Sequence, residues 1–212
     1  MDEAARQALT SRLTGIYAIV NQSDATLEIA RAALSAGVRI LQYRAKSGIV
    51  AEDLRALRAL TRERDAALVM NDDWHAALTF ECDGVHLGPD DERFHDIATV
   101  RAALGPGLIG ASCGTAQEAR AAQAMGVDYV GVGAVFPTAS KGDAGAPLGI
   151  GGLARVAAAT TLPVAAIGGI DASNIARVRA TGVAMAAVIS AIADASDRQR
   201  AAAELVSLWG SR

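Results

Sequence analysis

The stretch MGVDYVGVGAVFPTASK, residues 125–141, contains the unit from which the fold can be predicted. A glycine ends a helical pattern, an apolar run at 129–132 follows at once, and hydroxyls and a lysine come after it. Glycine just after a helix supplies the left-handed backbone that terminates it. Ala-Gly-Val at 36–38 and Thr-Gly-Val at 181–183 occupy the same position between a helical pattern and an apolar run. We therefore expect a repeated helix, turn and strand.

Apolar runs of strand length recur along the whole chain, with helix-like segments between them. They span residues 16–20, 40–43, 67–70, 84–87, 108–111, 129–132, 164–167 and 186–189. Continuous apolar runs are typical of parallel strands buried on both faces, and their alternation with helices indicates βαβ units. Eight such units predict an α/β fold, a single (β/α)8 TIM barrel, with residues 1–212 forming one domain.

Composition excludes several classes of partner. The net charge of -3 offers no general attraction to nucleic acid or anionic lipid. The longest apolar run, 183–195, contains Ser190 and Asp194 and is shorter than the roughly 18 residues that suggest a membrane span. The N-terminus lacks the basic start and apolar centre of a secretory signal. We expect a cytoplasmic protein that binds neither nucleic acid nor membrane, and the alanine-rich helices are compatible with a homo-oligomer.

Cationic side chains gather where strands of the predicted barrel end, which is where such barrels carry their active sites. Gln42, Arg44 and Lys46 alternate with period two, so in a continuing strand their side chains point into one volume. Two readings are open: the cations are solvated at the rim, or they bind an anion. Lys141, after another strand, adds a third cation and favours a phosphate or pyrophosphate ligand.

Carboxylates follow the next two strands. Asp72 and Asp91 come after strands whose axes run about 5 Å apart, so both could reach one ion. Two carboxylates beside phosphate-binding cations are the usual provision for Mg²⁺. Asp73 and Asp90 are interpreted as caps of the following helices. Asn71 can donate and accept, as recognition of a heterocycle edge requires.

A second anion site is predicted at the other side of the barrel. Gly168-Gly169 and Ile189-Ser190 end the last two strands, where many barrels bind a phosphate with backbone N–H groups. A glycine pair alone is more often only a tight turn, but its position after the seventh strand favours binding. Thr138 and Ser140 add donors between the two sites.

Histidine and cysteine carry no predicted chemistry. The three histidines lack ligand spacing, and His86 is interpreted as a structural residue at a strand end. Cys82 and Cys113 have neither zinc spacing nor disulfide density and are expected to be buried free thiols.

With these residues described, the chain resembles the thiamine phosphate synthase family over nearly its full length. The segments that carry the resemblance occur in family order: Gln-x-Arg-x-Lys, Met-Asn-Asp, Gly-Val-His-Leu-Gly, Gly-Val-Gly-Ala-Val-Phe-Pro-Thr-x-Ser-Lys and Ala-Ile-Gly-Gly-Ile. Each is modest alone, but the ordered set is specific. The resemblance implies an enzyme, a transferase of thiamine biosynthesis. It condenses 4-amino-2-methyl-5-(diphosphooxymethyl)pyrimidine with a thiazole phosphate, plain or carboxylated, to give thiamine phosphate and pyrophosphate.

The resemblance also implies roles for individual residues. The pyrimidine diphosphate is held by Gln42, Tyr43, Arg44, Ala45, Lys46, Asn71, Ser112 and Lys141. The thiazole phosphate is held by Thr138, Ala139, Ser140, Gly169, Ile189 and Ser190. Asp72 and Asp91 hold the cofactor Mg²⁺, and the catalytic cations that stabilise departing pyrophosphate are Arg44, Lys46 and Lys141.

Departures and alternatives accompany that assignment. Pro89 stands where the family often has Gln, Gly114 where His or Asn is common, and Ser140 where Thr is usual.

The nearest alternative is a thiazole tautomerase-like paralogue, which needs no diphosphate or metal. A phosphosugar barrel would share only the second anion site. A non-catalytic sensor of thiazole phosphate is a third alternative, but it could lose the two aspartates without penalty, and both are present.

Overall fold

The computed structural model describes residues 2–46, 48–88, 96–138 and 146–210. The strands in these ranges are β1 (Gly15–Asn21), β2 (Ile40–Arg44), β3 (Ala67–Asn71), β4 (Gly84–Leu87), β5 (Leu108–Cys113), β6 (Tyr129–Val132), β7 (Val164–Ile167) and β8 (Met185–Val188). The helices are α1 (Asp2–Thr10), α2 (Thr26–Ser35), α3 (Ala51–Glu63), α4 (Trp74–Thr79), α5 (Ile97–Leu104), α6 (Ala116–Met125), α7 (Gly149–Ala157), α8 (Ile175–Arg179), α9 (Ser190–Ala193) and α10 (Arg198–Gly210).

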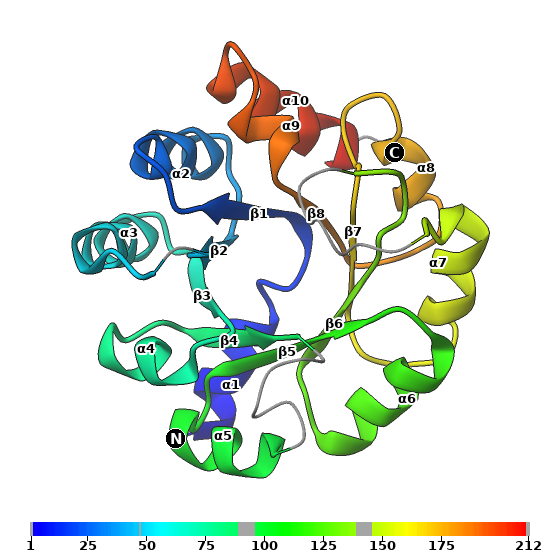
Figure 1. Ribbon diagram of the computed structural model, residues 1–212, viewed down its shortest axis with the longest axis horizontal. Coiled ribbons are helices and arrows are strands. Elements are labelled where there is room, and N and C mark those ends of the chain that lie inside the picture. The colour runs from blue at the N-terminus through cyan, green and yellow to red at the C-terminus, as the bar shows by residue number, and fades with distance from the viewer. Residues whose placement is uncertain (1, 47, 89–95, 139–145, 211–212) are drawn as a thin grey trace.

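The strands close into a parallel barrel. They follow one another in chain order from β1 to β8, and β8 pairs with β1. Figure 1 looks into this barrel and shows the helices arranged around it. The predicted (β/α)8 barrel is therefore confirmed. The predicted apolar runs coincide with the strands, except that β8 begins and ends one residue earlier than expected and several strands continue into polar residues.

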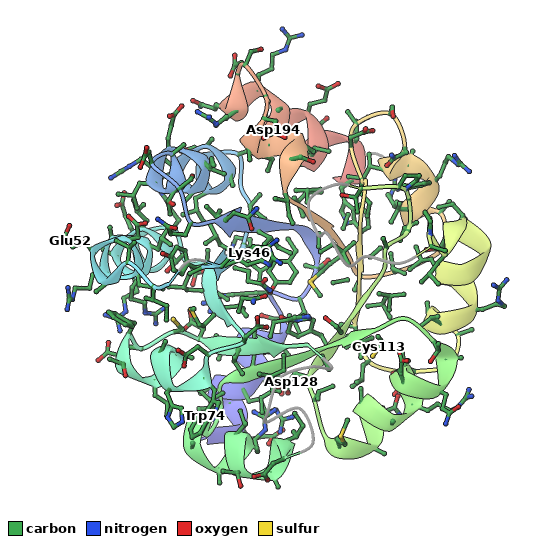
Figure 2. The ribbon with its side chains drawn as sticks, viewed as in Figure 1. Lys46, Glu52, Trp74, Cys113, Asp128 and Asp194 are labelled. Atoms are coloured by element: carbon green, nitrogen blue, oxygen red, sulfur yellow. The ribbon has the colours of Figure 1, made fainter. Side chains whose placement is uncertain are left out.

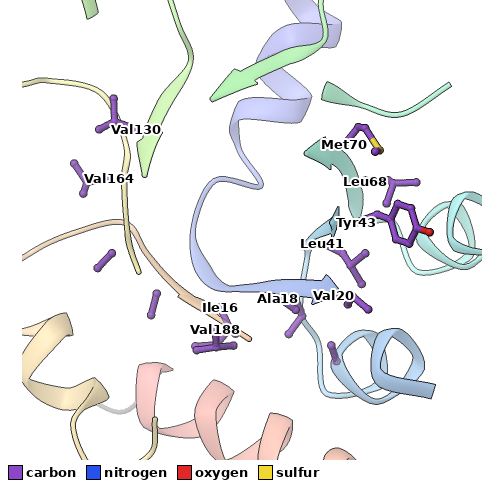
Figure 3. Close-up of a cluster of buried hydrophobic side chains, with 14 of the residues drawn as sticks. Ile16, Ala18, Val20, Leu41, Tyr43, Leu68, Met70, Val130, Val164 and Val188 are labelled. Atoms are coloured by element: carbon purple, nitrogen blue, oxygen red, sulfur yellow. The ribbon is translucent and has the colours of Figure 1, made fainter. Parts of the chain in front are cut away.

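Side chains on each strand alternate between two apolar layers. The outer layer, between strands and helices, includes Ala18, Leu41 and Tyr43. Figure 3 shows Tyr43 directed toward α3 and away from the barrel interior. The inner layer includes Tyr17, Ile40 and other residues one position out of phase with the first set. Because the pleat has period two, polar residues in phase with the inner layer face the barrel interior.

Helix α1 precedes the repeat and was not predicted. Leu9 at its end and Leu13 after it pack against the inner apolar layer. Arg6 of α1 forms an ion pair with Asp128, which immediately precedes β6, at 2.6 Å. Asp128 also accepts from Arg101 at 2.5 Å and from the Ile109 N–H at 2.7 Å. The helix thus closes the amino-terminal end of the barrel, opposite the ends where function is expected.

Across the described ranges, no helix combines the length and apolar character needed to cross a membrane.

Candidate active site

A cavity of about 400 Å³ opens at the carboxyl ends of the strands. Its lining includes predicted site residues from six strands or the segments after them: Gln42, Arg44, Asn71, Asp72, Ser112, Thr138, Gly169, Ile189 and Ser190. Residues from β2 to β5 line one side, and residues that follow β6 to β8 line the other. The volume is in the range of small-molecule sites in enzymes.

Only some of the predicted residues in β2 and just after it line the cavity. Gln42 is only 2% exposed, and its Nε2 donates to the Tyr17 hydroxyl at 2.8 Å. Arg44 ends β2 inside the cavity, and its Nη1 donates to Asn21 Oδ1 at 3.3 Å. Tyr43, Ala45 and Lys46 are not among the lining residues. The Tyr43 hydroxyl instead accepts from the Val50 N–H at 3.3 Å in the outer layer.

Lys46 lies beyond the strand, so the period-two argument does not fix its direction. Its side chain is exposed. In the projection of Figure 2 it lies on the barrel side of β2, whereas Glu52 of α3 lies at the outer edge of the molecule.

The residues after β3 take three different positions. Asn71 ends β3 and lines the cavity. Asp72 also lines it with a φ of 65°, in the left-handed region that non-glycine residues seldom adopt. Its backbone N–H donates to the His86 carbonyl at 2.9 Å, which ties this turn to β4. Asp73 points away and caps α4 by accepting from the Ala76 N–H at 2.8 Å, as predicted. The unusual backbone at Asp72 is the kind found at functional sites.

His86 contributes to the cavity, whereas the sequence indicated only a structural role at a strand end. It lines the cavity from β4 and lies between two hydroxyls. Its Nε2 is 3.1 Å from Ser112 Oγ, and its Nδ1 is 3.1 Å from the Tyr129 hydroxyl. The spacing of the three histidines could not indicate this role, because the partners of His86 are a tyrosine and a serine on other strands.

The glycine pair after β7 packs closely against the segment after β6. The Phe136 N–H donates to the Gly168 carbonyl at 3.0 Å, and Asn174 Nδ2 donates to the Gly169 carbonyl at 2.8 Å. A Cβ on Gly169 would lie 2.9 Å from Phe136 Cβ, so only glycine fits without a shift. Thr138 lies in the same cavity wall. The structure therefore brings together the polar ends of β6 and β7.

Ile189 and Ser190 continue that wall after β8. Ser190 begins α9, a helix of four residues, and both residues line the cavity with Gly168 and Gly169. The described residues that were predicted to bind the second anion therefore all line this cavity, and their binding of an anion remains a prediction.

Gly114, one of the departures from the family pattern, has its backbone engaged by an acidic side chain. Glu118 Oε2 accepts from the Gly114 N–H at 2.6 Å and from the Thr115 N–H at 3.1 Å. Glu118 forms a capping box with Thr115 at the start of α6 and also lines the cavity. The sequence prediction did not include this carboxylate, although Thr-x-x-Glu at 115–118 is a recognisable helix start.

Several predicted residues lie outside the described ranges: Asp91, Ala139, Ser140 and Lys141, together with Pro89 and Asp90. Their assignments remain predictions.

The two thiols are unsuited to nucleophilic catalysis. Cys82 and Cys113 are free; Cys113 is buried as expected, whereas Cys82 is only partly buried, and desolvation raises the pKa of each to about 12. A thiol must ionise to act as a nucleophile, so Cys113 is a packed residue although it borders the cavity.

Fold and cavity together define the class of protein: a (β/α)8 barrel enzyme whose cavity at the carboxyl ends of the strands contains several polar side chains. Comparison with known proteins defines the family. The family model described as thiamine monophosphate synthase matches residues 16–192. The thiamine-phosphate synthase of Archaeoglobus fulgidus is 47% identical over 184 residues, which cover 85% of each chain. That of Moorella thermoacetica is 43% identical over 185 residues, covering 85% of this chain and 86% of the relative.

Solved structures agree with the sequence comparisons. Thiamine phosphate pyrophosphorylase from Pyrococcus furiosus superimposes with a TM-score of 0.83 at 35% identity and covers 96% of both chains. A 3-hexulose-6-phosphate synthase, at 19% identity and a TM-score of 0.67, shares the fold alone. The chain belongs to the thiamine monophosphate synthase family, and it is a transferase of thiamine biosynthesis.

Proposed function

We propose that this protein joins 4-amino-2-methyl-5-(diphosphooxymethyl)pyrimidine to a thiazole phosphate, forming thiamine phosphate and releasing pyrophosphate. The observation that carries the proposal is the shared cavity. Gln42, Arg44, Asn71 and Ser112 line it together with Thr138, Gly169, Ile189 and Ser190. Direct transfer between two reactants requires that both be bound in contact, and one cavity that contains both sets of predicted residues supplies that arrangement.

The wall from β2 to β5 suits the pyrimidine diphosphate. Arg44 provides a fixed positive charge and a planar set of donors for phosphate oxygens. The amide of Asn71 can pair with a ring edge that both donates and accepts. Lys46 and Lys141 are proposed to complete the cationic set around the diphosphate, on the strength of the family motif.

The wall formed after β6, β7 and β8 suits the smaller monophosphate. Thr138 and Ser190 offer hydroxyl donors, and the segment at Gly169 brings bare backbone to the cavity. Ala139 and Ser140 are proposed to belong to the same wall.

Mg²⁺ is the proposed cofactor, with Asp72 and Asp91 as its protein ligands. The described residues contain no cluster of three or more His, Cys, Asp or Glu side chains able to hold a metal by themselves. Asp72 in the cavity nevertheless fits Mg²⁺, which usually takes only one or two carboxylates and completes its shell with water and substrate phosphates. When bound, the ion supplies positive charge that neutralises a diphosphate leaving group.

The proposed reaction breaks the bond between the pyrimidine methylene carbon and the diphosphate oxygen, whose electron pair leaves with pyrophosphate. The thiazole nitrogen then gives its lone pair to the methylene carbon. No base is needed, because that lone pair is already free. The protein contributes orientation of both reactants and positive charge from Arg44, Lys46 and Lys141 where negative charge develops.

The test is thiamine phosphate formation from the two substrates, measured after oxidation to a fluorescent product, with Mg²⁺ and with chelator. Product that depends on Mg²⁺ supports the proposal and its cofactor. Absence of product while thiazole phosphate still binds would contradict it and favour a tautomerase-like enzyme or a sensor.

A further inference from the structure

A chain of five polar side chains crosses the barrel interior beside the cavity. Gln42 Nε2 lies 2.8 Å from the Tyr17 hydroxyl, which lies 2.9 Å from the Tyr129 hydroxyl. Tyr129 continues to His86 Nδ1 at 3.1 Å, and His86 Nε2 to Ser112 Oγ at 3.1 Å. We call these residues the polar chain. It joins β2 to β5 through the centre of the barrel, and every member except Tyr129 lines the cavity.

The two tyrosines at the centre are almost completely buried, although Tyr17 lines the cavity. Tyr17 is 1% exposed and Tyr129 is 0% exposed, and their rings meet edge to face at 5.9 Å. Burial raises the pKa of both hydroxyls well above the usual value for tyrosine. Each phenol therefore keeps its proton near neutral pH and has one hydrogen to donate.

Neighbouring strands leave space for the contact between Tyr129 and His86. A Cβ on Gly110 would lie 2.5 Å from both His86 Nδ1 and the Tyr129 hydroxyl oxygen. A Cβ on Gly131 would lie 3.0 Å from His86 Cε1. A larger residue at either glycine would therefore displace the His86 or Tyr129 ring. Glycine at both positions leaves room for the hydrogen bond between these two side chains.

The direction of the polar chain follows from counting protons. Gln42 donates to Tyr17 through its amide nitrogen, so the Tyr17 proton is available for Tyr129. Counted over the described residues, the Tyr129 proton then goes to His86 Nδ1, which places the imidazole proton on Nε2, facing Ser112. With Gln42 donating, the reverse direction would leave the Tyr17 proton with no acceptor among the described residues, at the cost of a buried unsatisfied donor.

We infer that Tyr129, together with Tyr17, is a positioning residue that holds His86 in its Nε2–H form, so that the Ser112 hydroxyl directs its own proton to a substrate atom in the cavity. The identity of that substrate as the pyrimidine diphosphate rests on the proposed function. The amide oxygen of Gln42 is left as an acceptor at the other end. The polar chain therefore presents the Ser112 hydroxyl as a donor and the Gln42 amide oxygen as an acceptor to the cavity, and it couples their orientations.

The first test needs no substrate. In protein labelled with ¹⁵N-histidine, long-range ¹H–¹⁵N correlation spectra distinguish the two imidazole tautomers, and His86 is assigned by the signal lost in His86→Asn. We expect the Nε2–H form in the wild type and a mixture of tautomers in Tyr129→Phe. Thr61→Val is the matched control, because it removes another buried hydroxyl, which donates to the Arg58 carbonyl in α3, and it should retain the wild-type tautomer.

The second test is kinetic. Tyr129→Phe should raise the KM for the pyrimidine diphosphate about tenfold while leaving the KM for thiazole phosphate unchanged, since the two residues that lose their orientation, Ser112 and Gln42, are both assigned to the pyrimidine diphosphate. Tyr17→Phe interrupts the same chain at another link and should act alike, which keeps the test available if one variant fails to fold.

An Nδ1–H tautomer in the wild type, or unchanged tautomer and KM values in both phenylalanine variants, would overturn the inference. If the wild type shows the Nε2–H form but makes no thiamine phosphate, the polar chain is supported and the proposed function is the part that fails.

Discussion

Gly169 lies so close to Pro137 that a Cβ on the glycine would overlap the proline carbonyl oxygen. The same glycine has a φ of 62°, in the region that residues with a side chain rarely adopt. Close approach and backbone conformation therefore both require glycine where the segment after β6 meets the end of β7. This contact supports the part of the cavity that is proposed to bind the thiazole phosphate.

Gly169→Ala should raise the KM for thiazole phosphate at least tenfold and lower the free energy of unfolding by about 1–3 kcal/mol, because overlap forces the wall to shift. Steady-state kinetics and denaturant unfolding measure the two effects. Gly126→Ala is the matched control: its φ is 84°, but a Cβ there meets nothing within 4 Å. It should lose about 1 kcal/mol and retain both KM values. An equal KM for thiazole phosphate in the two variants would refute a role for the segment at Gly169 in binding this substrate.

Asp72→Asn should lower turnover by about a hundredfold or more, because it removes a carboxylate charge proposed to hold Mg²⁺ while preserving size. Lys141→Ala should have a comparable effect. Rates are measured at saturating substrate across a range of Mg²⁺ concentrations. The neighbouring Asp73→Asn serves as the control, since Asp73 caps α4 and asparagine is an equally good cap. Near wild-type turnover in Asp72→Asn would remove the residue from the proposed site.

Asp128→Asn should lower the free energy of unfolding by about 3 kcal/mol, because the Asp128 side chain is 1% exposed and accepts from two arginines. Asp65→Asn is a contrasting control. That carboxylate also pairs with two arginines but is 69% exposed, so its loss should cost less than about 1 kcal/mol. Urea unfolding measures both variants. If both variants lost the same free energy of unfolding, the buried Asp128 carboxylate would not be what holds α1 to the barrel.

Alkylation of the two thiols should be slow at pH 8 and rise about tenfold per pH unit. Burial raises both pKa values to about 12, so the reactive thiolate is about a thousandfold scarcer at pH 8 than for an ordinary cysteine. The rate should level off only above pH 12 while the fold persists. Stopped-time alkylation followed by mass spectrometry reports each site separately. Rapid labelling of Cys113 at pH 8 with loss of activity would contradict its role as a packed residue.

The sequence predicted the barrel well because each buried parallel strand is a continuous apolar run that needs no partner to be recognised. It predicted that Gln42 and Arg44 would face one volume because β2 has period two, and both line the cavity. The same argument did not extend to Lys46, because β2 ends at Arg44.

What the sequence could not provide is contact between strands. His86 is interpreted as structural from sequence, because the three histidines lack ligand spacing. Its neighbours Tyr129 and Ser112 lie 43 and 26 positions away and meet it only when the barrel closes. Tyr17 and Tyr129, 112 positions apart, are apolar strand residues in sequence and hydrogen-bond partners in space. Helix α1 was missed because it precedes the first repeat and resembles no other unit.

Both substrates are proposed to occupy one cavity and to react there directly. Initial rates of thiamine phosphate formation, measured while both substrates are varied, test this proposal. We predict intersecting reciprocal plots, because both reactants must be bound before the new bond forms. Parallel plots would mean that the pyrimidine is first transferred to the protein, and they would contradict direct transfer between the two bound substrates.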